Sequence, residues 1–249
     1  MPFLLRLLPL LCALPVAAET LQVGVFNVSP WVFVGQDGRV QGALVDFYDR
    51  EVAPRAGVTL QWQAPTTVAR MLEDMRTGRL QLTPILVRRA EREKQVLFGS
   101  SIVARFEPCI VVRPDSSLDA IRSAEQLRGL TIAYNVGGTQ PDMLLSPGIT
   151  LERTGVPNWE TANLGKLRLG RVDAAFFYDV FSPRYFSLRS GEAVRILKLP
   201  VPPTVLHPAF SPKLDPALRE RIDKAVAAVA DKLPQYQAAY LYGDKAAQP

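Results

Sequence analysis

Four basic side chains lie close together in the first half of the sequence and are the strongest candidates for binding an anion. They are Arg88, Arg89, Arg92 and Lys94. A guanidinium can donate two parallel hydrogen bonds to the oxygens of a carboxylate, and it tolerates the loss of water better than an ammonium does. Charged runs usually face solvent, so composition alone favours a surface role over a ligand role. Carboxylate binding and a surface position are therefore both open for this run.

A glycine-rich loop in the second half is another candidate for anion binding. Residues 135–140 read Asn-Val-Gly-Gly-Thr-Gln. Glycines that precede a helix let backbone N–H groups approach an anion, and the helix dipole adds favourable charge. Thr139 lies three residues before Asp142, so it can equally be an ordinary helix cap. Gly138 and Thr139 are candidate ligand residues on this basis.

The scarcity of histidine and cysteine excludes several kinds of catalytic and metal site. His207 is the single histidine, which excludes a zinc site with two histidine ligands and leaves one possible base for serine or cysteine catalysis. The two cysteines, Cys12 and Cys109, exclude a disulfide-rich scaffold. The sequence contains no phosphate-binding loop, paired-metal motif or nucleophile elbow. We expect neither a metal nor a cofactor.

The overall composition indicates a globular chain without a nucleic-acid partner. Its 48% hydrophobic and 21% charged residues fit neither a disordered tail nor a membrane-spanning bundle. The net charge of +5 is scattered along the chain, whereas binding to a phosphate backbone needs a clustered basic stripe. We expect a monomer whose partners are not nucleic acids.

The first eighteen residues have the pattern of a cleaved export signal. Arg6 precedes the apolar run Leu7–Leu14, and small residues close the segment at Ala18. This run is shorter than the roughly 20 residues that span a bilayer, which favours a signal peptide over a membrane anchor. Cleavage after Ala18 leaves 231 residues, a net charge of +4 and Cys109 as the one cysteine. We therefore expect a soluble exported protein without an internal disulfide bond.

Strands and helices alternate in both halves of the chain, which predicts an α/β fold with mostly parallel sheets flanked by helices. Apolar runs predict strands at residues 21–25, 58–63, 80–86, 110–113, 130–134, 149–151 and 174–178. Helical spacing and cap residues predict helices from about residue 43 to Gly57, from Thr66 to Gly78, after Thr139, and at 159–169. Pro54 should kink or end the first of these helices.

The C-terminal part has a helix but no complete sheet of its own. Asp215 and Pro216 open this helix, and its expected apolar face consists of Leu218, Ile222, Ala225, Val226 and Val229. The segment can fold back onto the first half, giving two lobes joined by two crossover strands. We expect lobe 1 to contain residues 19–106 and 205–249, and lobe 2 to contain residues 107–204.

Several motifs, in their order and spacing, resemble those of the family 3 periplasmic solute-binding proteins, which deliver polar amino acids and similar solutes to ABC importers. The matching segments are Leu21–Val25, Pro30-Trp31, Gly42–Asp46, Gly78–Arg92, Phe98–Ser100, Gly170–Ala174 and the ending from Phe210 to Tyr242. The resemblance covers nearly all of the chain after the export signal. It implies the type II periplasmic-binding-protein fold, in which two lobes close on a ligand in the cleft.

The resemblance also assigns roles to individual residues. Arg92 stands, without gaps, where the family arginine grips the ligand carboxylate, and the loop with Gly138 and Thr139 stands where the family completes that clamp. Arg89 replaces a family threonine, so a second cation either lies near the cleft or points outward. Trp31 is expected at the cleft, where it can stack on a ligand, although an aromatic of this kind can also belong to a lobe core. Phe47 is expected in the helix core.

The sequence departs from the amino-acid-binding pattern in the second lobe. The resemblance places the aspartate that pairs with a ligand ammonium five residues after Asp173, where this chain has Tyr178, and Asp179 comes one residue later. A shift of one residue on a strand moves a side chain to the opposite face. Either a bulge lets Asp179 serve, or Tyr178 lines the site and no carboxylate meets an ammonium. Since Pro84–Val87 also lacks the family's hydroxyl groups, a carboxylate-bearing solute of more apolar character is expected.

Three functions are compatible with this pattern. The first is a receptor that closes on a small carboxylate-bearing solute for ABC import. The second is a periplasmic sensor that presents bound ligand to a membrane signalling protein. The third is an exported enzyme similar to cyclohexadienyl dehydratases, which needs a carboxyl acid or base in the cleft. Glu91 and Asp179 are the available carboxyls, but neither lies in a catalytic motif, so we expect no enzymatic activity.

Overall fold

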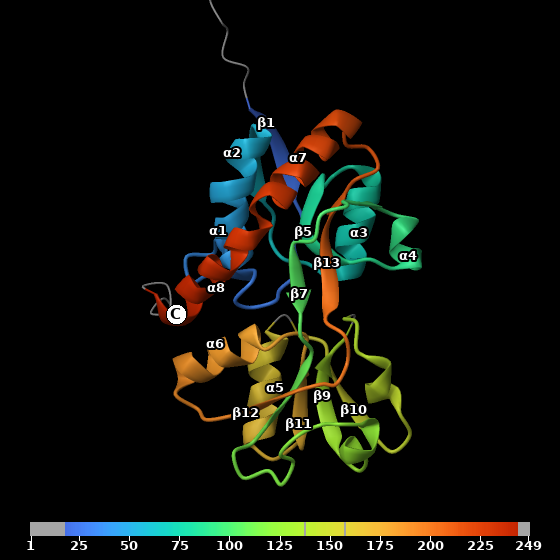
Figure 1. The fold of residues 1–249 in the computed structure, drawn as a ribbon, viewed down its shortest axis with the longest axis vertical. Helices are drawn as coiled ribbons and strands as arrows, with labels where there is room; N and C mark the ends of the chain where they lie inside the picture. Colours follow the sequence, from blue (N-terminus) through green and yellow to red (C-terminus); the bar gives the residue numbers. More distant parts are fainter. Residues whose placement is uncertain (1–17, 137, 157, 244–249) are drawn as a thin grey trace, which may run out of the picture.

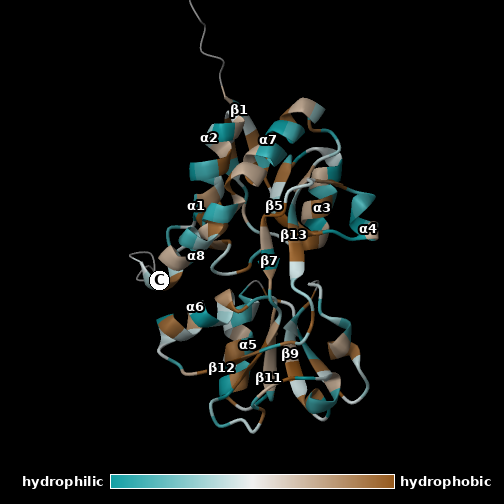
Figure 2. Ribbon diagram, in the orientation of Figure 1, coloured by the Kyte–Doolittle hydropathy of each residue, from teal (hydrophilic) through white to brown (hydrophobic). Residues whose placement is uncertain are grey.

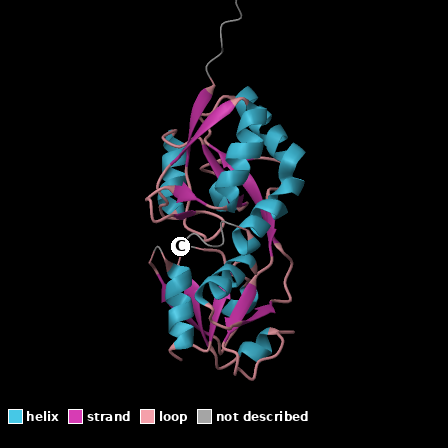
Figure 3. Ribbon diagram, turned by 90° about the vertical axis from the view of Figure 1, so that its left-hand side faces the viewer, coloured by secondary structure: helices cyan, strands magenta, loops and turns pink. Residues whose placement is uncertain are grey.

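The computed structural model describes residues 18–136, 138–156 and 158–243. Two units lie end to end along the long axis of the molecule, and each is built around its own β-sheet (Figure 1). We call the unit that contains the N-terminal strand lobe 1 and the other unit lobe 2. A view turned by 90° shows helices on both sides of the strands in lobe 1 (Figure 3). The predicted α/β architecture of two sheets flanked by helices is confirmed.

The lobe 1 sheet has the strand order β4-β1-β5-β13-β6, with β7 also paired to β13. Its strands are β1 (Glu19–Val23), β4 (Val58–Trp62), β5 (Leu82–Val87), β6 (Leu97–Phe98), β7 (Ala104–Phe106) and β13 (Thr204–Phe210). β1 runs parallel to β4 and β5, whereas β13 runs antiparallel to β5, β6 and β7. A strand from the last fifth of the chain therefore lies inside the first sheet. A short hairpin of β2 (Phe33–Val34) and β3 (Val40–Gln41) accompanies this lobe.

The lobe 2 sheet has the order β10-β9-β11-β8-β12. Its strands are β8 (Cys109–Val112), β9 (Thr131–Asn135), β10 (Thr150–Thr154), β11 (Ala174–Phe177) and β12 (Arg195–Lys198). β9 is parallel to β10 and β11, while β8 is antiparallel to β11 and β12. Both sheets are thus mixed rather than mostly parallel, because the strands next to the two crossings return in the opposite direction. The chain passes between the lobes from β7 to β8 and again from β12 to β13.

The helices that flank the sheets contain both hydrophilic and hydrophobic residues, while the strands are largely apolar (Figure 2). In lobe 1 they are α1 (Ala43–Phe47), η1 (Tyr48–Val52), α2 (Ala53–Ala56), α3 (Val68–Thr77), α4 (Ala90–Glu93), α7 (Pro216–Val229), η4 (Ala230–Lys232) and α8 (Leu233–Tyr242). In lobe 2 they are η2 (Ala124–Leu127), η3 (Asp142–Leu145), α5 (Trp159–Arg168) and α6 (Phe181–Ser190). No helix in the described part of the chain has the length and apolar character that a membrane span requires.

The helix predicted for residues 43–57 is divided into three parts. A π-helical turn, η1, separates α1 from α2, and Pro54 lies in the first turn of α2. Because proline has no N–H and its ring crowds the carbonyl four residues earlier, regular α-helical bonding cannot continue through this point. Tyr48 in the π-helical turn donates a hydrogen bond to the carbonyl of Pro84 at 2.8 Å, which ties this helix to β5. Gly57 ends the helix in the left-handed region, as predicted.

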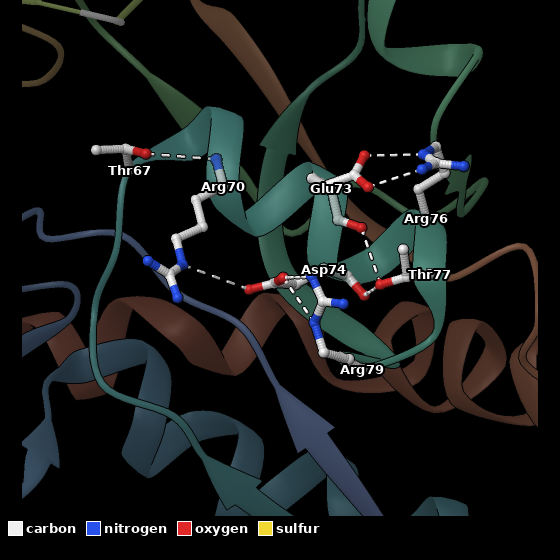
Figure 4. Close-up of polar contacts among 7 residues, drawn as sticks. All are labelled: Thr67, Arg70, Glu73, Asp74, Arg76, Thr77 and Arg79. Atoms are coloured by element: carbon white, nitrogen blue, oxygen red, sulfur yellow. Dashed lines mark hydrogen bonds and ion pairs between the residues drawn. The ribbon is translucent and has the colours of Figure 1, made fainter.

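The start of α3 differs by one residue from the prediction. Thr67, and not Thr66, is the N-cap, and its side-chain oxygen accepts a hydrogen bond from the N–H of Arg70 at 3.3 Å. The N–H of Thr66 instead donates to the carbonyl of Val25. Beyond the cap, the outer face of α3 carries ion pairs of Arg70 and Arg79 with Asp74 and of Arg76 with Glu73 (Figure 4). These contacts belong to a solvated helix face and lie outside the candidate site.

The C-terminal helix α7 agrees with the prediction at every apolar position. Its buried residues are Leu218, Ile222, Ala225, Val226 and Val229. The N–H of Leu218 donates to Asp215 Oδ1 at 2.9 Å, so Asp215 caps the helix. Spacing at three and four residues therefore identified the core face of this helix correctly.

Candidate ligand-binding site

Arg92 lies in α4, directly after the end of β5, and its guanidinium is half-buried. Its Nη1 donates a hydrogen bond to the carbonyl of Val87 at 3.0 Å. Burial lowers the pKa of Arg92, and the nearby charge of Arg89 lowers it further. Within the described ranges, no carboxylate oxygen lies within 4.0 Å of this guanidinium. Among the residues that the structure describes, this partly dehydrated cation therefore has a carbonyl as its one hydrogen-bond partner.

The other basic residues of this run are paired with acids on the surface. Arg88 Nε lies 2.5 Å from Glu93 Oε1, and Arg89 Nη1 lies 3.6 Å from Glu91 Oε1. The side chain of Arg89 is 43% exposed, in contrast to the half-buried Arg92. Of the two orientations open for Arg89, the structure has the one in which it forms a local ion pair at the surface.

Tyr178 and Asp179 both lie just beyond the end of β11, which stops at Phe177. The alternation of side chains along a strand therefore does not determine which of the two lines the site. Each of them has a distinct environment. Tyr178 Oη donates to the carbonyl of Asn135 at 3.4 Å, and a Cβ atom on Gly138 would come within 1.5 Å of the same oxygen. Burial raises the pKa of Tyr178, and the positive charge of Arg92 opposes this rise. Tyr178 thus packs on the glycine loop.

The loop after β9 does not lead directly into a helix. The next element is the 3₁₀ turn η3, and its N-cap is Pro141. Thr139 is therefore not a helix cap, and the expected contribution of a helix dipole at Gly138 and Thr139 is wrong because a four-residue 3₁₀ turn provides no extended row of aligned peptides. The half-buried Thr139 remains in the loop next to Gly138.

Asp179 lies at the boundary between the lobes with both carboxylate oxygens engaged. Oδ1 accepts hydrogen bonds from the N–H groups of Phe181 at 2.6 Å and Ser182 at 2.8 Å. Oδ2 accepts from Trp31 Nε1 of lobe 1 at 2.5 Å. Burial raises the pKa of Asp179 to about 6, and these hydrogen bonds limit the rise.

Trp31 is buried between the lobes, with 2% of its surface exposed. Its ring lies 4.9 Å from that of Phe106 and 5.0 Å from that of Phe181, the latter an edge-on contact across the boundary. The loop that carries Trp31 is fixed by Gly42, whose φ is 141°. A Cβ atom at Gly42 would lie 2.2 Å from the carbonyl oxygen of Trp31. The backbone of this loop thus requires glycine at that position.

Glu160 is a site residue that the sequence did not reveal. It lies in the first turn of α5, is 1% exposed, and its Oε1 accepts a hydrogen bond from the N–H of Ser29 of lobe 1 at 2.7 Å. Burial raises its pKa to about 8, and the negative charge of Asp179 adds to the rise. An acid in the first turn of a helix is an ordinary feature because it complements the dipole, so no local signal marked this glutamate.

The residues left outside the site have local structural roles. His207 lies in β13, and its Nδ1 is 2.8 Å from the carbonyl oxygen of Ser101. Cys109 is a free, buried thiol in β8. Phe47 is fully buried in the lobe 1 core, as predicted. No group of three or more possible metal ligands occurs among the residues that the structure describes.

Known structures resemble this fold over nearly all of its length. An ancestral arginine-binding protein bound to glutamine is 22% identical, with 91% of this chain and 99% of that chain covered and a TM-score of 0.71. The P235GK mutant of ArgBP from T. maritima is 24% identical, with 91% and 96% covered and the same TM-score. The Bordetella pertussis BvgS periplasmic VFT2 domain is 21% identical, with 89% and 93% covered and a TM-score of 0.73. At these identities the likeness shows the two-lobed fold alone.

Sequence comparison gives the family. No curated protein matches the chain. The family model of bacterial extracellular solute-binding proteins, family 3, matches residues 21–241, which is most of the chain. This family consists of binding proteins, in agreement with the prediction that the chain is not an enzyme. The chain therefore belongs to family 3 of the bacterial extracellular solute-binding proteins.

Proposed function

We propose that the protein is a receptor that closes on a small carboxylate-bearing solute between its two lobes. The observation that supports this most directly is the half-buried Arg92, which has a carbonyl partner but, within the described ranges, no carboxylate within 4.0 Å. A buried charge is costly unless an opposite charge or several hydrogen bonds compensate it. A solute carboxylate would supply that compensation by forming a bidentate ion pair with the guanidinium.

The facing residues of lobe 2 complete this binding site in our proposal. Tyr178 packs on Gly138 at the end of β11, and we assign its hydroxyl to the lobe 2 side of the binding site. The adjoining loop with Thr139 offers a hydroxyl and backbone N–H groups to the same anion. Arg89 contributes long-range positive charge from the surface and no direct contact.

The environment of Asp179 favours a solute without an α-ammonium group. Both of its oxygens already accept hydrogen bonds, from the backbone of α6 and from Trp31. An ammonium at this point would have to displace the indole N–H. We therefore propose an organic acid with an apolar body in preference to an ordinary α-amino acid.

The same binding step can serve either of two membrane partners. Import through an ABC permease is the use that the family resemblance implies. Presentation of the solute to a membrane sensor is the second candidate, since closure of the same two lobes on a solute would serve it equally. The membrane proteins encoded beside the gene would distinguish the two uses.

We also propose that the chain reaches the periplasm through a cleaved signal peptide at residues 1–18. The family is described as extracellular, and these residues have the charged start, apolar centre and small-residue end of an export signal. N-terminal sequencing of the exported protein should give a chain that begins at Glu19. A chain that still begins at Met1 would contradict cleavage.

A screen of matched solutes tests the binding proposal. The mature chain is melted with pairs that differ only in the α-ammonium group, such as 3-phenylpropionate and phenylalanine, 4-methylpentanoate and leucine, or glutarate and glutamate. We expect an acid without the ammonium to raise the melting temperature, since a ligand at 100 times its dissociation constant stabilises by about 2.7 kcal/mol. Binding of the amino-acid members alone would contradict the proposed solute class, and no binding of any carboxylate would contradict the function.

A further inference from the structure

The two lobes contact each other directly through a short segment of lobe 1, residues 27–31. Three hydrogen bonds among the described residues join this segment to lobe 2. They run from Ser29 N–H to Glu160 at 2.7 Å, from Trp31 Nε1 to Asp179 at 2.5 Å, and from Trp159 Nε1 to the carbonyl of Asn27 at 3.5 Å. The contact thus combines backbone and side-chain groups from both sides of the boundary.

These contacts are shielded from water. Trp31, Glu160 and Asp179 expose 2%, 1% and 4% of their surfaces. The ring of Trp31 packs edge-on against Phe181, the first residue of α6, and the ring of Phe33 lies 6.2 Å from that of Tyr185 in the same helix. Separating the lobes would expose these aromatic rings to water and break the hydrogen bonds that the two carboxyl groups accept from lobe 1.

We propose that residues 27–31 are the resting occupant of the cleft and hold the lobes closed when no solute is bound. We call this contact the inter-lobe latch. It goes beyond the proposed function because the family resemblance implies closure by a ligand, whereas here the chain supplies its own bridging groups. An incoming solute then has to bind while the latch is open, so its apparent affinity equals its intrinsic affinity multiplied by the fraction of molecules that are open.

Closing the latch removes water from two carboxyl groups, so it should depend on pH. Burial raises the pKa of Glu160 from 4.5 to about 8 and that of Asp179 from 3.8 to about 6. In the open form both groups return toward ordinary values. At a pH between the ordinary and the raised pKa of each group, the closed form therefore holds more protons than the open form. Lowering the pH favours closure, and raising it through about 8 favours opening.

The ionisable neighbours do not titrate in the same range. Cys109 Sγ in β8 lies 3.2 Å from the backbone carbonyl of Asp179, and the ring of Tyr178 at the end of β11 lies 5.5 Å from that of Trp159, the residue before Glu160. Burial raises the pKa of both side chains above their ordinary values. The charged groups around these neighbours are Arg92, Arg184 and the ion pair between Glu107 and Lys198. The pH dependence of lobe closure should therefore come from the protonation of Glu160 and Asp179.

Distance measurements between spin labels test the latch without any solute. Cysteines replace the exposed residues Gln36 in lobe 1 and Thr161 in lobe 2, and the buried Cys109 stays unlabelled. The protein is unfolded and refolded before labelling so that co-purified solute is removed. We expect one short distance for the wild-type background at about pH 5.5, and a longer distance to appear at about pH 8.5.

Variants identify the contacts responsible. Trp31→Phe combined with Glu160→Ala should remove the short distance, while Glu160→Gln, which keeps an acceptor and cannot ionise, should keep the lobes closed at the higher pH. Trp62→Phe is the matched control, because Trp62 also donates its indole N–H to a carboxylate, Asp49, but within lobe 1. It should leave the distance unchanged.

Three outcomes would overturn the latch. One is a long distance in the solute-free wild-type background at the lower pH, which needs no variant to fold. Another is a short distance that persists in the double variant, and the third is a distance that does not respond to pH. None of these outcomes involves a solute, so they leave the solute-binding proposal standing. Failure of every carboxylate to bind would contradict the solute-binding proposal and leave the latch standing.

Discussion

Replacing Arg92 with methionine is expected to weaken binding of the carboxylate solute by about 100-fold, or about 3 kcal/mol. Methionine keeps much of the length of the side chain but removes the charge and the hydrogen-bond donors. The solute carboxylate would then enter a partly dry site without its counter-ion. Titration calorimetry with the strongest ligand from the matched screen measures the change, and unaltered affinity would contradict the clamp.

Two further substitutions, one at Arg88 and one at Arg92 itself, test whether the loss of affinity comes from the Arg92 guanidinium. Arg88→Met removes an equally long arginine from the same segment, but Arg88 pairs with Glu93 at the surface, so solute affinity should stay unchanged. Arg92→Lys keeps the charge but loses the planar guanidinium that donates two parallel hydrogen bonds. The solute affinity of this variant should therefore lie between those of the wild type and Arg92→Met. The melting temperature of solute-free Arg92→Met should not fall, because the variant no longer pays for burying an uncompensated guanidinium. A large drop would indicate a structural role instead.

Gly42→Ala should produce the largest loss of stability of the variants considered, about 3 kcal/mol or a drop of about 10 °C in melting temperature. The backbone at Gly42 has φ 141° and ψ 170°, a region that residues with a Cβ atom rarely adopt. The added methyl group would also lie 2.2 Å from the carbonyl oxygen of Trp31. Relief of that clash requires movement of the loop that carries Trp31.

Gly165→Ala is the matched control for this substitution. Gly165 lies inside α5, and a Cβ atom there would meet nothing within 4 Å. Alanine in place of glycine within a helix should raise stability by about 0.5–1 kcal/mol. Thermal melting of the two variants should therefore give shifts of opposite sign. A Gly42→Ala protein that melts like the wild type would contradict the backbone argument.

The sequence predicted the elements well wherever the signal was local. The apolar face of α7 and the stops at Gly57 and Gly78 follow from spacing and backbone freedom that involve only neighbouring residues. The return of the C-terminal segment to the first half was also predictable, since a helix and a strand without a sheet must pack on another unit. Most predicted element ends were correct to within one or two residues, as at Thr66, whereas α6 and β12 were not predicted and the helix expected after Thr139 is a 3₁₀ turn.

The contacts between the lobes could not be predicted in the same way. Glu160 and Ser29 are 131 residues apart, and Trp31 and Asp179 are 148 apart. Each has an ordinary local explanation, as a helix-start acid, a turn residue or a core aromatic, and only the tertiary fold brings them together. The choice between Tyr178 and Asp179 was undecidable for a related reason. The alternation rule assumes that the strand continues, whereas β11 ends at Phe177.

The position of β13 between β5 and β6 has a consequence for the order in which the chain can fold. The strands of lobe 2 are consecutive in the sequence, so this lobe can form as soon as its own residues are available. Lobe 1 has to wait, because its sheet lacks an inner strand until residues 204–210 arrive. During that interval the buried, apolar edge of β5 has no neighbour and can pair with other chains. The lobe that contains β1 is therefore the last part of the molecule to become compact.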